Sequence, residues 1–201
     1  MTPLSTGHPA LDEALGGGWA RGRILEVFGR NAVGPRALLL AACASMRASG
    51  LPVAYVDVEH ALEPAQAAAL DIVCQPDDGD QAVDIVDALT RSGAVGLVVV
   101  DSVAGLVPQL ALGGDITLGL HARMMSQAMR KIVGVAERAG VTLLFANRLY
   151  THRRTFGSWE TTCGGNALKY FASQRVEVVD GRARVVKNRF APPFVTCELT
   201  L

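Results

Sequence analysis

The sequence lacks the features that mark secreted, membrane-bound or metal-binding chains. No apolar run reaches the length that spans a bilayer, and the first residues show no basic segment followed by an apolar one. The four cysteines, Cys43, Cys74, Cys163 and Cys197, are far apart and not in the spacing of metal ligands. We therefore expect a chain of the reducing cytoplasm, with no membrane partner and no bound metal.

Net charge is also missing. The 19 lysines and arginines balance the 19 aspartates and glutamates, so no overall field attracts a polyanion. Nucleic-acid binding would have to come from a local basic patch. Half of the 201 residues are hydrophobic, which is enough to bury a large core in one globular domain over residues 1–201. We find no internal repeat, linker or low-complexity segment.

Apolar segments typical of buried strands alternate with helical segments along most of the chain. The strand segments are 24–28, 52–58, 96–100 and 141–147, and the main helical ones are 38–49, 81–91 and 120–139. A strand-rich tail covers 174–179, 183–187 and 194–201. The pattern predicts an α/β domain with a mainly parallel central sheet flanked by helices, and antiparallel strands at the C-terminal end. Segments 108–118 and 148–165 are predicted loops, and a loop as long as the second is usually functional.

The segment between the first strand and the following helix has the frame of a phosphate-binding loop. Gly29 and Gly34 stand five residues apart, as that loop requires. A working loop continues with lysine and serine or threonine, whereas this chain has Pro35 and Arg36. Pro35 has no N–H to donate, and Arg36 has no oxygen to offer a cation. These two residues predict that binding of ATP and Mg²⁺ is lost and that the chain is not an enzyme.

Several long segments, in order over nearly the whole chain, resemble the RecA recombinase family. They are Ser5-Thr6-Gly7, Asp57–Pro64, Arg91–Val95, Val99–Ala104, Ala122–Lys131, Glu160–Lys169 and Val186–Asn188. The resemblance implies the RecA-like core fold. It implies that Glu59 matches the base that activates water and that Asp101 matches the acidic residue on the metal side. It also shows departures, because Arg148 replaces the glutamine that senses the γ-phosphate and Gln66 replaces an aromatic residue that stacks on adenine.

The resemblance implies that the residues of the family's DNA-binding surface are retained more fully than those of its nucleotide site. Arg123, Ser126 and Arg130 match contacts to the DNA backbone, and their spacing puts them on one helix face. Next to them we expect free N–H groups and further positive charge, supplied by Gly164, Gly165, Asn166, Arg148, Arg153 and Arg154. The family's first DNA loop, around 110–117, looks about two residues shorter here by that comparison.

Lys187 and Arg189 match basic residues that the family extends across the subunit interface toward a neighbour's ATP; two solvated strand residues are the alternative. The family's N-terminal docking helix and strand, and its C-terminal domain, have no counterpart in the sequence. A chain of this kind could complete another subunit's ATP site without extending a filament through its own docking arm.

These features together predict a non-ATPase RecA-like accessory protein of DNA repair and damage tolerance, similar to the ImuA-type proteins of SOS mutagenesis and translesion synthesis. Its expected partners are DNA, preferably single-stranded, a RecA filament and a translesion polymerase. Two alternatives stay open. One is a weak DNA-dependent ATPase of the RecA type, in which Arg36 or Arg30 supplies charge beside Glu59 and Asp101. The other is a protein-interaction scaffold without DNA binding, comparable to RecA-like division inhibitors.

Overall fold

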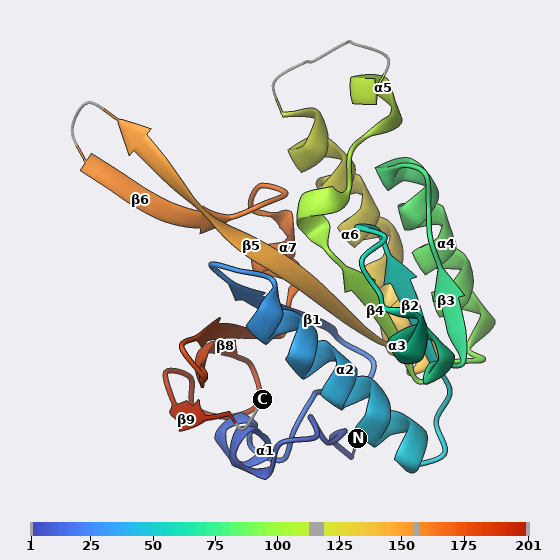
Figure 1. Ribbon diagram of the computed structural model, residues 1–201, viewed down its shortest axis with the longest axis vertical. Coiled ribbons are helices and arrows are strands. Elements are labelled where there is room, and N and C mark those ends of the chain that lie inside the picture. The colour runs from blue at the N-terminus through green and yellow to red at the C-terminus, as the bar shows by residue number, and fades with distance from the viewer. Residues whose placement is uncertain (1, 113–118, 155–156, 200–201) are drawn as a thin grey trace.

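A sheet of nine strands runs through the computed structural model, which describes residues 2–112, 119–154 and 157–199 (Figure 1). The strand order is β3-β2-β4-β5-β1-β7-β8-β9, and β6 pairs with the outer part of β5. The strands are β1 (Ile24–Gly29), β2 (Val53–Asp57), β3 (Ile72–Cys74), β4 (Leu97–Asp101), β5 (Thr142–Arg154), β6 (Gly157–Thr162), β7 (Gln174–Val179), β8 (Arg182–Asn188) and β9 (Thr196–Glu198). The six strands from β3 to β7 are parallel, and β8 and β9 add antiparallel pairs. The predicted α/β fold with a mainly parallel sheet is confirmed.

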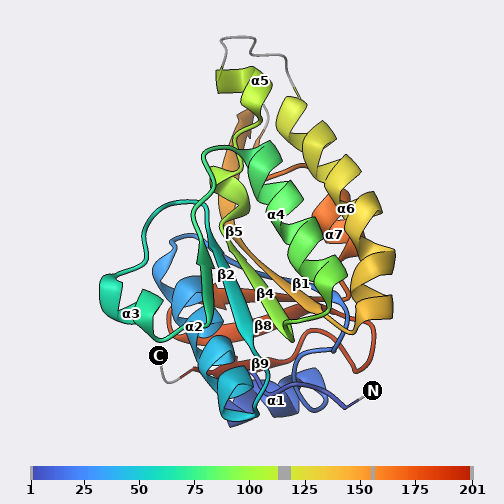
Figure 2. The same ribbon diagram turned by 90° about the vertical axis from the view of Figure 1, so that its right-hand side faces the viewer.

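Helices cover both faces of this sheet. On one face α1 (Pro9–Leu15) and α2 (Val33–Ala48) pack against side chains such as Leu25 and Val27. On the other lie α4 (Gly79–Ser92), α6 (Leu120–Ala139) and α7 (Ala167–Phe171), as Figure 2 shows. The central strands β2 and β4 are buried along their whole length because both of their faces are covered, which explains their continuous apolar runs.

The predicted loop 148–165 is wrong over most of its length. Strand β5 continues from the sheet to Arg154 and pairs in antiparallel register with β6, so that Leu149 faces Thr162. The hairpin projects away from the helices (Figure 1). Its sequence shows no apolar period because a hairpin outside the core has no buried face to mark, and only its threonine, tyrosine and tryptophan indicate strand.

Shorter helices complete the connections. They are α3 (Pro64–Ala68), η1 (Val103–Gly105) and α5 (Gln109–Leu112). Helix α5 replaces the start of the predicted loop 108–118, while most of the shortened loop around 110–117 lies outside the described residues. Within the described ranges, no helix is both long and apolar enough to cross a bilayer.

Candidate nucleotide site and DNA-contacting surface

The loop between β1 and α2 keeps its backbone frame. A Cβ on Gly29 would lie 2.7 Å from the carbonyl oxygen of Val178 and 3.2 Å from Cγ of Pro35, so only glycine fits there. Helix α2 begins at Val33, which makes Pro35 its third residue. The first-turn N–H groups of a helix have no acceptor within the helix, so the missing N–H of Pro35 costs the helix no hydrogen bond.

Asp101, at the carboxyl end of β4, is bound on one oxygen by two donors. Its Oδ2 accepts from Nε of Arg36 at 2.6 Å and from the hydroxyl of Tyr55 at 2.7 Å. The side chain of Asp101 is only 3% exposed. Burial, together with the charge and hydrogen bond of Asp101, raises the pKa of Tyr55. Burial opposes the charged form of Arg36, but the hydrogen bond and charge of Asp101 outweigh it and the pKa of Arg36 is raised.

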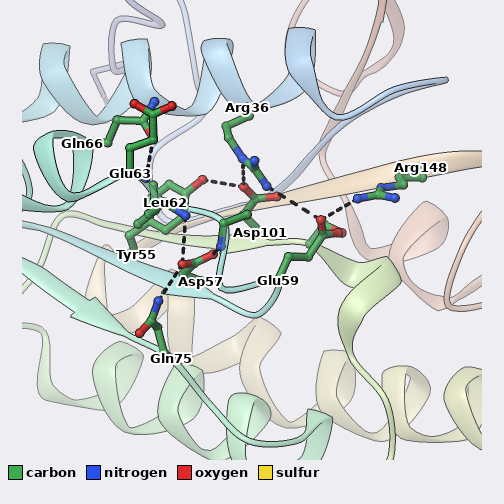
Figure 3. Close-up of polar contacts among 12 residues, drawn as sticks. Arg36, Tyr55, Asp57, Glu59, Leu62, Glu63, Gln66, Gln75, Asp101 and Arg148 are labelled. Atoms are coloured by element: carbon green, nitrogen blue, oxygen red, sulfur yellow. Dashed lines mark hydrogen bonds and ion pairs between the residues drawn. The ribbon is translucent and has the colours of Figure 1, made fainter.

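Glu59 lies beside the same arginine and reaches a second one. Its Oε1 accepts from Oγ of Ser102 at 2.5 Å, and its Oε2 accepts from Nη2 of Arg148 at 2.5 Å. Nη2 of Arg36 lies 3.8 Å from the same Oε2. Figure 3 shows the resulting chain of charges, Asp101–Arg36–Glu59–Arg148, along the carboxyl ends of the strands. We call these four residues the charge cluster.

The polar side chains next to the charge cluster form hydrogen bonds with nearby backbone groups. Asp57 accepts from the N–H groups of Ala61 and Leu62, at 3.0 and 3.2 Å, and from Nε2 of Gln75 at 3.0 Å, so it fixes the turn after β2 (Figure 3). Gln66 accepts from the N–H of Glu63 at 3.1 Å and so caps α3. Tyr55, Asp57 and Ser102 were not predicted as site residues. They lie at or near the carboxyl ends of two adjacent buried strands, and that position was the signal that could have identified them.

The charge cluster offers what a magnesium nucleotide needs. Mg²⁺ takes oxygen ligands and is usually held by one or two carboxylates together with substrate phosphates. Asp101 and Glu59 are such carboxylates, and they lie next to the start of α2, where N–H groups favour phosphate. In the described conformation Arg36 pairs with both carboxylates. Arg30 instead pairs with Glu160 on β6 at 2.9 Å.

The residues predicted to contact DNA share one exposed face of α6. Arg123 and Arg130 are exposed, and Arg130 donates to Oγ of Ser126 at 2.6 Å and to its carbonyl oxygen at 3.1 Å. Arg153 and Arg154 lie on β5, but their side chains are outside the described part of the chain. The side chain of Arg148 turns to Glu59 instead, so it belongs to the charge cluster.

Gly164 and Gly165 pack against the first turns of α6, and Asn166 follows them as the N-cap of α7. Gly164 and Gly165 have φ values of 78° and 71°, the left-handed region that glycine tolerates. A Cβ on Gly165 would lie 2.7 Å from Cβ of Ala122, which directly precedes Arg123. The structure therefore brings this turn and the basic face of α6 together. Their DNA contacts stay a prediction.

Lys187 and Arg189 have a local role at the end of α7. Nζ of Lys187 donates to the carbonyl oxygens of Lys169 and Tyr170 at 2.8 and 3.0 Å, and Nη2 of Arg189 donates to that of Tyr170 at 3.0 Å. Cations are favoured at helix C-termini. Burial and the charge of Arg189 lower the pKa of Lys187. Neither residue is a free strand residue, and their predicted reach to a neighbouring subunit stays a prediction.

Helix η1 lies between the charge cluster and the glycine turn that packs on α6. A Cβ on Gly105 would lie 3.2 Å from Cγ of Glu59, and one on Gly164 would lie 3.0 Å from Cγ1 of Val103. One end of η1 therefore packs closely on Glu59 of the charge cluster. The other end packs on Gly164, in the glycine turn beside α6.

Comparisons with known proteins find relatives named RecA and a solved structure described as the RadB recombinase. The chain is 43% identical to the protein named RecA of Synechococcus sp. (strain CC9605) and 44% identical to that of Borrelia hermsii, each match covering 98% of this chain. It spans 59% and 63% of those two relatives. Among solved structures, one described as the RadB recombinase has a TM-score of 0.70 and 25% identity, over 96% of this chain and 93% of that one.

These relatives correct two predictions. The likeness to proteins named RecA, over nearly the whole chain, overturns the prediction that the chain is not an enzyme and the prediction that it binds neither ATP nor Mg²⁺. Both rested on two side chains, Pro35 and Arg36. The backbone at Gly29 still requires glycine, and Glu59 and Asp101 each lie within 4 Å of Arg36.

A family model extends the match to the whole sequence. The model described as the RecA N-terminal domain matches residues 1–201. It covers the charge cluster, the loop before α2 and the basic face of α6 together. The narrower resemblance to ImuA-type proteins stays a prediction. The chain belongs to the RecA N-terminal domain family.

Proposed function

We propose that this chain is the nucleotide- and DNA-binding core of a RecA-type protein that hydrolyses ATP in response to DNA during DNA repair. The observation that carries the proposal is the meeting of two sites at one end of the sheet. Glu59 and Asp101 lie beside the start of α2, and η1 links them to the turn that packs on the basic face of α6.

Each part of the site has a role in that reaction. The first-turn N–H groups of α2 would face the phosphates, because a helix start favours anions. Asp101 and Glu59 would hold the magnesium that accompanies the nucleotide, and Glu59 would orient the attacking water as a general base. Arg123 and Arg130 contact DNA phosphates, which makes the binding steeply dependent on salt.

ATP hydrolysis with and without single-stranded DNA tests the proposal. We expect DNA to stimulate hydrolysis by the wild type. Glu59→Gln keeps a side chain of the same size and should lower the rate by at least about hundredfold, the scale of a lost general base. Glu137→Gln is the control, because Glu137 pairs with Arg23 at 2.7 Å, away from the cluster. A wild type that hydrolyses no ATP with any DNA contradicts the proposal.

The cellular setting is a finer proposal. The RecA-like relatives support DNA repair, and the predicted damage-tolerance role adds a cytoplasmic RecA filament and a translesion polymerase as partners. Co-sedimentation of the chain with filaments on single-stranded DNA, and pull-down of a polymerase after DNA damage, test the two partners separately. If the chain binds neither a RecA filament nor a polymerase, the proposal is reduced to a protein that acts on DNA without these partners.

A further inference from the structure

Arg36 and Arg148 hold the two carboxylates of the charge cluster between them. Arg36 contributes Nε to Asp101 at 2.6 Å and approaches Glu59 to 3.8 Å, and Arg148 closes on Glu59 from the base of the hairpin at 2.5 Å. A guanidinium stays charged over the whole physiological pH range, so both arginines carry a full positive charge in these contacts. Two positive charges therefore balance the two negative charges at the place where a cation would bind.

The arrangement leaves donors unused. Nη2 of Arg36 and Nε of Arg148 are buried and have no hydrogen-bond acceptor within the described residues. A buried donor without an acceptor is costly, and a guanidinium binds phosphate oxygens in a bidentate manner. The paired state is thus one that a polyphosphate can displace, because it offers the same two arginines more acceptors than the carboxylates supply.

We propose that Arg36 and Arg148 form a clasp that closes Asp101 and Glu59 to a free divalent cation and opens when a triphosphate takes over the guanidinium groups. The inference rests on the proposed function. The clasp adds to that function that the divalent cation and the nucleotide bind together, because a cation alone would approach carboxylates whose charge the two arginines already balance. Arg36 is the main element because it touches both carboxylates, and Arg148 is the weaker one because it touches Glu59 alone.

Thermal unfolding in the presence of Mg²⁺, without nucleotide, tests the clasp directly. We expect the Tm of the wild type to be nearly unchanged between zero and 10 mM Mg²⁺. Arg36→Thr leaves both carboxylates partly unpaired and should gain a Mg²⁺-dependent rise of about 3 °C or more. Arg47→Thr is the matched control, because Arg47 lies on the same helix and pairs with Asp71 at 3.1 Å. It should gain no such rise.

A second variant keeps the test decisive if Arg36→Thr does not fold. Arg148 is 41% exposed, so Arg148→Gln should fold and should show a smaller rise, because it frees Glu59 alone. Equal responses to Mg²⁺ in the wild type and in the folded variants overturn the clasp.

Titration with a fluorescent ATP analogue separates the clasp from the proposed function. In the presence of Mg²⁺, Arg36→Thr or Arg148→Gln should lower the affinity by about tenfold, the scale of one lost charge-assisted hydrogen bond. Without Mg²⁺, the wild type should bind the analogue more tightly than Arg36→Thr, because Arg36 then serves the phosphates. A wild type that binds no analogue contradicts the proposed function, while the Mg²⁺ response without nucleotide still decides the clasp.

Discussion

The charge cluster and the basic face of α6 differ in burial and in whether their charged groups have partners of opposite sign. In the cluster, Asp101 is almost fully buried and each charged group has a partner of opposite sign within 4 Å. On α6, Arg123 and Arg130 are exposed, and the hydrogen bonds of Arg130 within the described residues go to Ser126, a neutral residue of its own helix. Buried charges must be balanced within the protein, whereas exposed ones are available to a partner. We therefore expect substitutions in the first region to act on folding and on the proposed nucleotide binding, and those in the second to act on the proposed DNA binding.

The largest expected effect comes from breaking a buried pair. Asp101→Ala leaves Arg36 and the hydroxyl of Tyr55 without their acceptor and should lower the free energy of unfolding by roughly 3–5 kcal/mol. Urea unfolding measures this change. Asp84→Ala is the control, because Asp84 is 76% exposed where it pairs with Lys131 and should cost less than about 1 kcal/mol. Similar losses in both variants would remove the contrast between buried and exposed charge.

Charge reversal on α6 should leave folding intact and damage DNA binding. Arg123→Glu together with Arg130→Glu should weaken binding to single-stranded DNA by about a hundredfold, and should reduce the salt dependence by about one phosphate contact per arginine. Fluorescence anisotropy at several salt concentrations measures both. Arg138→Glu, near the other end of the same helix, should change neither. A double variant that binds as the wild type does would favour the protein-interaction scaffold.

The glycine turn beside α6 allows a matched pair of stability tests. Gly165→Ala meets Cβ of Ala122 at 2.7 Å and also strains a left-handed residue, so it should cost about 2 kcal/mol or more. Gly181→Ala has the same backbone strain, at a φ of 74°, but nothing within 4 Å of the added carbon, and should cost about 1 kcal/mol. Urea unfolding of both variants measures the difference. Equal losses would mean that the turn is not tightly packed on α6.

The smallest expected effect is a pH dependence at the start of α6. Burial lowers the pKa of His121 below its usual 6.5, and a hydrogen bond with the Val103 backbone opposes the shift. The folded state then binds fewer protons than the unfolded state below pH 6.5, so this contribution to stability falls as the pH falls through that range and is constant above it. His121→Gln should make unfolding less sensitive to pH between 5 and 7, as measured by urea titration. An unchanged pH profile would contradict this assignment.

The sequence was sufficient for the parallel sheet and insufficient for the hairpin, for one physical reason. Strands β2 and β4 are buried on both faces, and their continuous apolar runs record this. The outer half of β5 is outside the core, so no apolar period marks it and it was predicted as a loop.

The candidate site could also be predicted from the sequence only in part. Glu59, Asp101 and the loop glycines could be found from spacing and resemblance. The pairing of Arg36 with Asp101 joins residues 65 positions apart, and that of Arg148 with Glu59 joins residues 89 apart. Spacing along the chain does not specify such contacts, so the main prediction treated Arg36 as a lost oxygen ligand. Only the alternative of a weak ATPase placed Arg36 beside Glu59 and Asp101, where the structure has it.

Strand β5 has a mechanical consequence. It is continuous from the middle of the sheet to the end of the hairpin, and Arg148 stands where it leaves the sheet. The six residues beyond Arg148 extend the strand by about 20 Å. Tilting the strand by a few degrees about that point would swing its far end through an arc of more than an ångström. Because Arg148 binds Glu59, the outer part of the strand begins at a residue that belongs to the charge cluster.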